Sequence, residues 1–175
     1  MEAVLTYIRE TRPDQVIHVG DVDHRVLAPL REIYSGPVGA HRCGGSDLSR
    51  FDVEQLAEYH RIAPGWATTS GQFRDGGRRP GAALTEAKRV GLSLVMGATH
   101  NMASCTFTVG FDENARSTTG LEVGHLTPDH SCEGSDRGCK QGFCILSIDG
   151  SEVSYELAAI HPDGRITICD REWIG

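Results

Sequence analysis

Long apolar runs and aromatic residues are both scarce in this sequence. Aromatic residues make up 6% of the 175 positions, and no apolar stretch approaches the length of a signal-peptide core or a membrane span. The first twelve residues instead carry Glu2, Arg9 and Glu10 within an amphipathic pattern. We therefore expect a cytoplasmic protein with no membrane partner.

Basic residues are outnumbered by acidic ones. The chain has 17 lysines and arginines against 24 aspartates and glutamates, which gives a formal net charge of -7. A broad electropositive face for duplex nucleic acid is therefore not expected. A phosphoester substrate is not excluded, because a bound metal ion can attract phosphate even on an acidic protein.

The sequence contains no closely spaced pair of cysteines of the Cys-x-x-Cys type. The six cysteines are scattered and no Cys-x-x-Cys occurs, which favours reduced thiols over disulfide bonds in a cytosolic chain of this size. One loop-rich region nevertheless gathers residue types that suit zinc, without a known finger spacing. A small structural zinc site stays open there as an alternative, with the candidate ligands His125, His130, Cys132, Cys139 and Cys144.

The first half of the chain mixes helical and strand patterns. A chain of this length can bury one sizeable core, so we expect a single domain over residues 1–175. Apolar spacing predicts a buried strand over residues 15–19 and helices over residues 4–8, 26–33, 53–60 and 80–90. Gly91 suits the cap after the last of these helices.

The second half reads as antiparallel sheet. Short alternating segments predict strands over residues 105–109, 143–148, 153–160 and 166–168. Asp149-Gly150 and Asp163-Gly164 are turn signals between them. Early helices around strands, followed by hairpins, indicate an α/β (α+β) fold class with a layered domain.

Two short motifs follow predicted strands. Gly20-Asp21 comes after the strand at 15–19, and residues 97–100, which read Gly-Ala-Thr-His, follow the apolar run at 92–96. An aspartate and a histidine at neighbouring strand ends can share a divalent metal. Taken alone, Asp21 reads better as the cap of the following helix, and His100 as a hydrogen-bonded loop histidine.

Several segments carry a specific resemblance when taken in order. The chain is similar to phage-type calcineurin-like metallophosphoesterases in residues 14–22, 62–71, 80–100, 120–126 and 141–143, and at Trp173. The resemblance implies a two-sheet sandwich flanked by helices, with two metals at the strand ends. It also implies attack on phosphorus by a metal-bound hydroxide, a reaction that two adjacent metals support by neutralising charge.

The resemblance assigns the ligand positions one by one. Asp21 matches the aspartate that bridges both metals, and His100 matches the second histidine of the family's Gly-His-Thr-His. Ser70 and Ala98 stand where the family has its other histidine ligands. The family's opening Asp-x-His strand would precede Met1, so the resemblance implies an N-terminally truncated sandwich.

The family's Gly-Asn-His segment falls near residues 41–47, where no asparagine occurs. His41 is the candidate for its catalytic histidine, and Asp47 matches another fragment of the segment. A single ion at Asp21 and His100 could be supported by Asp23, His24 or His41, with water or substrate oxygens completing the coordination. Losing direct ligands should weaken a metal site by more than the ~10- to 100-fold cost of losing an outer partner.

These observations predict a metal-dependent phosphoester hydrolase or its weakly active descendant. The alternative is a catalytically inactive binding or interaction module on the same scaffold. The expected cofactor is Mn, Fe or Zn, as one ion or none, and the expected substrate is a phosphoester or nucleotide. A missing first strand would expose a sheet edge and favour a homodimer. If the chain is phage-derived, its compartment is the host cytoplasm.

Overall fold

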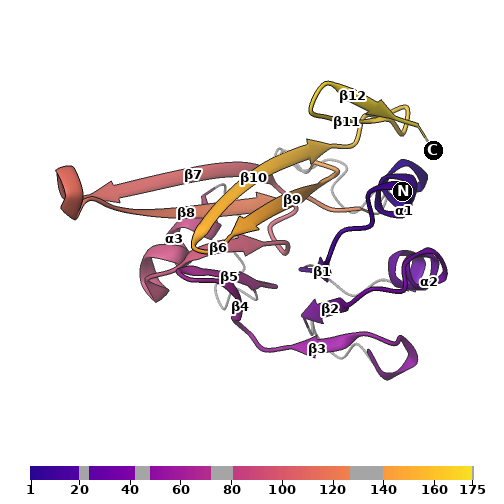
Figure 1. Ribbon diagram of the computed structural model, residues 1–175, viewed down its shortest axis with the longest axis horizontal. Coiled ribbons are helices and arrows are strands. Elements are labelled where there is room, and N and C mark those ends of the chain that lie inside the picture. Colours follow the sequence, from indigo (N-terminus) through magenta and orange to yellow (C-terminus); the bar gives the residue numbers. More distant parts are fainter. Residues whose placement is uncertain (20–23, 42–47, 72–80, 127–139, 175) are drawn as a thin grey trace.

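The computed structural model describes residues 1–19, 24–41, 48–71, 81–126 and 140–174. Within them lie three α-helices, two short 3-10 turns and strands grouped into several sheets (Figure 1). None of the described helices has the length and apolar character needed to cross a membrane. The α+β class expected from the sequence is confirmed.

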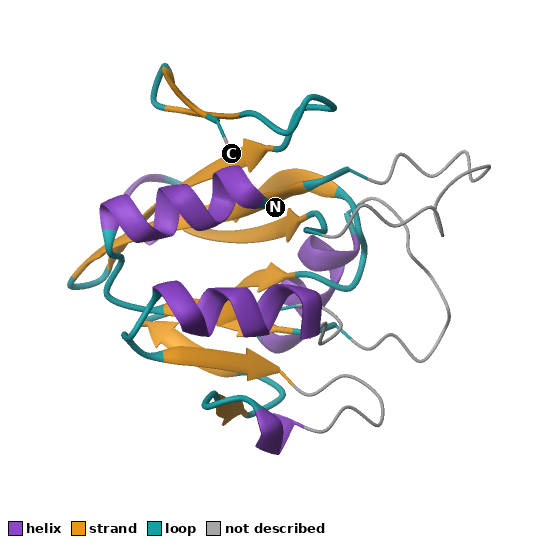
Figure 2. Cartoon of the chain, turned by 90° about the vertical axis from the view of Figure 1, so that its right-hand side faces the viewer, coloured by secondary structure: helices purple, strands orange, loops and turns teal. Residues whose placement is uncertain are grey.

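The N-terminal part is a small parallel sheet covered by two helices. Its strands run in the order β1 (Val16–His18), β2 (Val38–His41) and β3 (Glu54–Leu56). Helices α1 (Glu2–Thr11) and α2 (His24–Ile33) lie side by side against it (Figure 2). They bury a shared core made by Leu5, Leu27, Leu30, Tyr34, Val38, Ala40 and Leu48.

A five-stranded mixed sheet forms the centre of the molecule. Its order is β4 (His60–Ala63), β5 (Trp66–Thr69), β6 (Ser93–Met96), β8 (Arg116–Val123) and β7 (Met102–Val109). The neighbours β5, β6 and β8 are parallel, whereas the two outer strands run antiparallel to them. The β7–β8 hairpin extends away from the rest of the molecule and ends in a 3-10 turn, Asp112–Asn114 (Figure 1).

The two faces of this central sheet are covered differently. Helix α3 (Ala82–Val90) packs on one face around Ala67, Ala87 and Leu94. The hairpin of β9 (Gly142–Asp149) and β10 (Glu152–Ala159) covers the other face, where the contact is made by Val95, Leu121, Val123, Cys144, Leu146 and Leu157. This arrangement is the expected layered sandwich with flanking helices.

The C-terminal strands return to the N-terminal helix. The pair β11 (Ile166–Ile168) and β12 (Arg171–Trp173) packs on α1, with the Tyr7 and Trp173 rings 5.1 Å apart. Figure 1 accordingly shows both termini on the same side of the molecule. The predicted turn at Asp149-Gly150 is confirmed, since it joins β9 to β10 in regular antiparallel register.

The helix predicted over residues 53–60 is wrong. The chain there forms the 3-10 turn Leu48–Arg50 followed by β3 and β4, which belong to different sheets. Only Leu56 of the first strand is buried. Apolar residues three or four apart suggested a helical face, but pairing of β3 with β2 and of β4 with β5 overrides this weak local preference.

Candidate functional site at the strand ends

Three parallel strands of the central sheet end side by side. The loops that follow them are Ser70-Gly71 after β5, Gly97–Asn101 after β6, and Gly124-His125 after β8. The Ala98 N–H donates to the Ser70 carbonyl at 3.1 Å, and the Gly124 N–H donates to the Asn101 carbonyl at 2.6 Å. We call these three loops the strand-end site, because carboxyl ends of parallel strands are where α/β proteins gather their chemistry.

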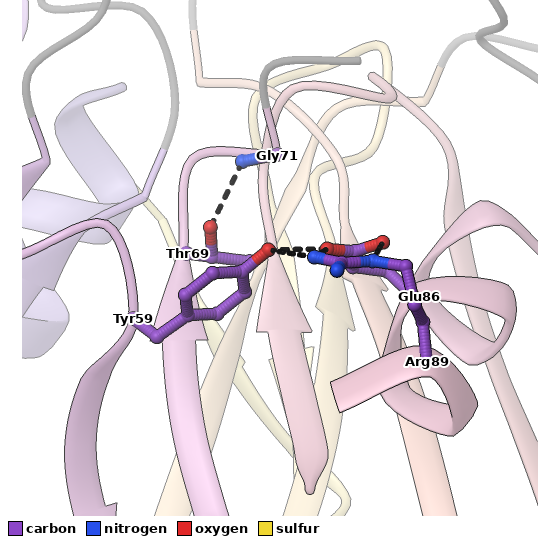
Figure 3. A network of polar contacts seen from close by, with 5 residues as sticks. All are labelled: Tyr59, Thr69, Gly71, Glu86 and Arg89. Carbon is purple, nitrogen blue, oxygen red and sulfur yellow. Dashed lines mark hydrogen bonds and ion pairs between the residues drawn. The ribbon is translucent and has the colours of Figure 1, made fainter. Parts of the chain in front are cut away.

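The first two loops are each stabilised by a hydrogen bond from a backbone N–H to a threonine hydroxyl two residues earlier. The Thr69 hydroxyl accepts a hydrogen bond from the Gly71 N–H at 3.2 Å, and the Thr99 hydroxyl accepts one from the Asn101 N–H at 3.3 Å. Figure 3 shows the bond between Thr69 and Gly71. Both threonines are buried, so water does not compete for the hydrogen bond that stabilises each turn.

Ser70 and Ala98 are therefore direct neighbours. The resemblance placed a lost histidine ligand at each of these positions, which are 28 residues apart in the sequence. Their backbone hydrogen bond brings the two positions together. A hydroxyl and a methyl group do not replace two imidazoles as metal ligands, so this part of the site lacks comparable ligands.

His100 has an unusual backbone conformation. Its φ angle is 57°, in the left-handed region that residues other than glycine rarely adopt. Such strain costs on the order of 1–3 kcal/mol and is concentrated at functional sites. Two backbone hydrogen bonds hold the residue there: its N–H donates to Gly97 at 3.3 Å, and its carbonyl accepts from Lys140 at 2.9 Å.

A second histidine lies beside His100. The imidazole centres of His100 and His125 are 5.4 Å apart, with 42° between the ring planes. Sequence reasoning considered His125 only for a separate zinc site. One sequence signal could have predicted that the two histidines lie close together. Each follows a glycine, Gly97 or Gly124, that comes directly after a parallel strand.

The structure places His41 inside the protein. Its side chain is 1% exposed, and its Nε2 lies 2.8 Å from the Thr68 hydroxyl on β5. Burial lowers its pKa to about 4, an effect that the nearby Ala57 backbone partly offsets. His41 is thus neutral at pH 7 and joins the small sheet to the central one. Its catalytic role stays a prediction.

Buried polar groups surround the same region. Asn101 is almost fully buried, and within the described residues its side-chain nitrogen has no hydrogen-bond partner. Glu122 on β8 is 1% exposed and accepts a hydrogen bond from the Ala83 N–H at 3.2 Å, at the start of α3. A carboxylate is well placed there, because helix N-termini carry unpaired N–H groups and partial positive charge. In the sequence, Glu122 is a single charged residue between the apolar residues Leu121 and Val123, a pattern that could have indicated a buried carboxyl group.

A polar network connects α3 to Tyr59, which directly precedes β4 (Figure 3). Arg89 donates to Glu86 and to the Tyr59 hydroxyl, each at 2.9 Å, and Tyr59 also bonds to Glu86. The hydrogen bonds from Arg89 lower the pKa of Glu86, while burial raises the pKa of Tyr59. This network supports the strand end without supplying a ligand to it.

Other predicted site residues lie outside the described residues. These are Asp21, Asp23 and Asp47, together with the zinc candidates His130, Cys132 and Cys139; of His24, only the backbone in α2 is described. Cys144 lies on β9, where burial raises its pKa to about 12. Within the described part, the cysteines Cys105, Cys144 and Cys169 are free thiols.

Few metal-binding side chains gather in the part of the strand-end site that the structure describes. Among the described residues, no three histidine, cysteine, aspartate or glutamate side chains gather closely enough to hold an ion. A complete two-metal centre therefore does not fit the described residues. The imidazole of His100 fits a single ion, and the resemblance supplies Asp21 as its partner.

The chain has relatives among phage proteins. It is 28% identical to the Gene 54 protein of Mycobacterium phage L5 over 234 positions, which cover 99% of this chain and 91% of the relative. The Gene 54 protein of Mycobacterium phage D29 is also 28% identical, over 235 positions with the same coverage. Both alignments exceed the 175 residues here, so the phage proteins carry extra residues within the matched region. No family model matches the chain.

Solved structures share the architecture. A single mutant of Vps29 from Entamoeba histolytica superposes with a TM-score of 0.63 and 16% identity, covering 95% of this chain and 86% of that chain. A double mutant of the same protein gives a TM-score of 0.55 and 16% identity, with 98% and 86% coverage. At this identity the likeness establishes the calcineurin-like phosphoesterase fold, but not an activity.

Proposed function

We propose that this protein is a phosphoester hydrolase of reduced capacity that works with one divalent ion, held by Asp21 and His100. The observation that carries the proposal is the strained backbone of His100 at the carboxyl end of β6. Of the non-glycine residues with positive φ in the described part of the chain, only His100 lies at the carboxyl end of a parallel strand, where such strain is associated with function. The shared fold and the phage relatives agree with this assignment without testing it.

In the proposed enzyme, each residue of the strand-end site has a role that follows from its position. His100 and Asp21 would bind the ion, which when present supplies an activated water and neutralises charge on phosphate. The Ser70 backbone holds the two neighbouring loops together through Ala98. His41, which lies 2.8 Å from the Thr68 hydroxyl, connects β2 to β5, and its catalytic role stays a prediction. A reduced rate is expected because Ser70 and Ala98 supply no ligand.

Metal analysis combined with an activity assay tests the proposal. The purified protein should bind about one equivalent of Mn²⁺ or Zn²⁺ and hydrolyse bis-p-nitrophenyl phosphate slowly. Asp21→Ala and His100→Ala should each abolish turnover, while His161→Ala, an exposed histidine near the C-terminal strands, should not. If the wild-type protein binds no metal, or if turnover survives both Asp21→Ala and His100→Ala, the proposed single-ion hydrolase is wrong.

The substrate class can be separated in the same assay. The net charge of -7 disfavours long duplexes, so we propose a small phosphoester or nucleotide over duplex nucleic acid. Parallel reactions with p-nitrophenyl phosphate, its diester, a short oligonucleotide and a DNA duplex distinguish these classes. Turnover confined to the oligonucleotide would contradict the small-substrate assignment.

An interaction module is the second candidate, and the edge strand β7 is the observation that favours it. In the described part of the protein, β7 pairs only with β8. Its eight residues include no charge and no proline, it exposes its own Phe107 and Val109, and the turn that follows it exposes Phe111. Natural proteins usually protect such an edge. We propose a second copy as its partner, because an antiparallel pair of identical edges closes on itself.

Light scattering over a range of concentrations tests this second candidate. The wild-type chain should form a dimer, and Thr106→Lys on β7 should shift it toward monomer. The matched substitution Ser117→Lys on the paired strand β8 should have a smaller effect. A monomer at all concentrations would remove the dimer, and a dimer insensitive to Thr106→Lys would place the contact elsewhere, for instance at β1.

A further inference from the structure

We propose that His100 and His125 together form a two-imidazole site for one nitrogen-preferring divalent cation such as Zn²⁺ or Co²⁺. In this site, His125 supplies a ligand from the loop after β8, in place of the one missing at Ala98. The inference rests on the proposed function, since it concerns the same strand-end site. It adds a ligand that the resemblance does not supply.

The two histidines lie in the loops that follow two neighbouring parallel strands, His100 four residues after the end of β6 and His125 two residues after the end of β8. Met96 on β6 pairs with Glu122 on the parallel strand β8, and each strand is followed by a glycine before its loop. Gly124 has a φ angle of 75°, so the chain turns sharply there and His125 follows at once. The tertiary pairing of the strands thus brings the two side chains to one edge.

One residue fixes the spacing between them. The Lys140 N–H donates to the His100 carbonyl at 2.9 Å, and the Lys140 carbonyl accepts from the His125 N–H at 3.1 Å. The His125 carbonyl in turn accepts from the Gly142 N–H at 3.0 Å, at the start of β9. These hydrogen bonds fix the backbones of both histidines without a bound ion, so the proposed site is preorganised for binding.

The ring separation suits a shared ion. Two imidazoles bound to one tetrahedral zinc at about 2.1 Å have ring centres roughly 5 Å apart. The observed separation is 5.4 Å, and the 42° angle between the planes departs from parallel stacking. The ring pair thus has the spacing of two ligands on one metal.

The chemistry of the pair favours particular metals. Imidazole suits zinc, cobalt, nickel and copper, whereas Mg²⁺ prefers carboxylate and water oxygens. Among the described residues, no third histidine, cysteine, aspartate or glutamate joins the pair, so water or phosphate oxygens would complete the coordination. We therefore expect Zn²⁺ and Co²⁺ to bind and Mg²⁺ to bind far more weakly.

Cobalt titration of the whole chain provides the test. Isothermal titration with Co²⁺, followed also by the visible absorption of the bound ion, should show one site. His100→Ala and His125→Ala should each lower the affinity at least about tenfold, the smaller end of the loss seen for an outer partner. His161→Ala is the matched control and should leave it unchanged. Far-ultraviolet circular dichroism and the melting temperature check that each variant folds, with His125→Gln as a second variant.

The outcomes separate this inference from the proposed function. If His125→Ala and His125→Gln bind Co²⁺ as wild type does, while His100→Ala and Asp21→Ala do not, the inference is overturned and the single-ion hydrolase stands. If both His125 variants lose the ion but Asp21→Ala retains it, the two-imidazole site stands and the Asp21 ligand fails. A folded wild type that binds neither Co²⁺ nor Zn²⁺ overturns both.

Discussion

The backbone N–H of Ala98 donates a 3.1 Å hydrogen bond to the carbonyl oxygen of Ser70. This bond joins the ends of β5 and β6 at the two positions where the family resemblance places histidine ligands. The two positions therefore lie side by side, although serine and alanine supply no imidazole there. That relationship makes the loss of ligands testable by restoring them.

Restoring both histidines should strengthen metal binding. The double variant Ser70→His/Ala98→His places two imidazoles on loops that are already bonded together, so Zn²⁺ affinity should rise at least about tenfold. Isothermal titration measures the change. Thr108→His, on an exposed position of β7, controls for a histidine added elsewhere. Unchanged affinity in a folded double variant would show that the ligand positions are misassigned.

The buried His41 should make stability depend on pH. Its pKa in the folded protein is lowered to about 4, below the ~6.5 of an exposed histidine, so the unfolded chain binds the proton first. Stability from this residue is intact above pH ~6.5 and is lost as the pH falls toward 4. The free energy of unfolding should drop by about 2 kcal/mol from pH 7 to pH 5.

Urea unfolding at both pH values measures this loss. His41→Gln keeps a donor for Thr68 without a group that titrates in this range, so its decrease should be clearly smaller. If wild type and His41→Gln lose the same free energy between pH 7 and pH 5, the destabilising proton binds elsewhere.

Removing the Glu122 carboxylate should destabilise α3. Its oxygen accepts from the Ala83 N–H, and Glu122→Ala would leave that buried donor unpaired beside the helix N-terminus. The expected cost is about 2 kcal/mol, measured by urea unfolding. Glu152→Ala, at an exposed position on β10, should change stability by less than about 0.5 kcal/mol. Equal effects of the two substitutions would rule out the capping role.

Gly120 on β8 should not tolerate a side chain. A Cβ atom there would meet the Leu84 nitrogen at 2.2 Å and the Ala83 carbonyl carbon at 2.5 Å, so α3 would have to move off the sheet. Gly120→Ala should cost about 3 kcal/mol and lower the melting temperature. Gly65→Ala has open space but a φ angle of 77°, and it should cost only about 1 kcal/mol. A smaller cost at Gly120 than at Gly65 would contradict this packing.

Much of the local structure was predictable because it depends on nearby residues. The apolar face of α1 ends before Pro13, and α3 ends at Gly91 in the left-handed conformation, both as expected. The hairpin of β9 and β10 followed from alternating residues on either side of Asp149-Gly150. Strands β2 and β3 were missed, since each has at most four residues and forms by pairing with a strand remote in sequence.

The sequence by itself determined the fold class and the three main helices, because spacing and residue type carry that information. The candidate ligands His100 and Asp21 came from the family resemblance and stay predictions. Only the tertiary structure decided that Ser70 lies against Ala98, that His125 lies beside His100, and that His41 is buried. These relationships arise from the parallel pairing of β5, β6 and β8 and from the contact between two sheets. Contacts between distant segments depend on how strands assemble, and no local pattern encodes them.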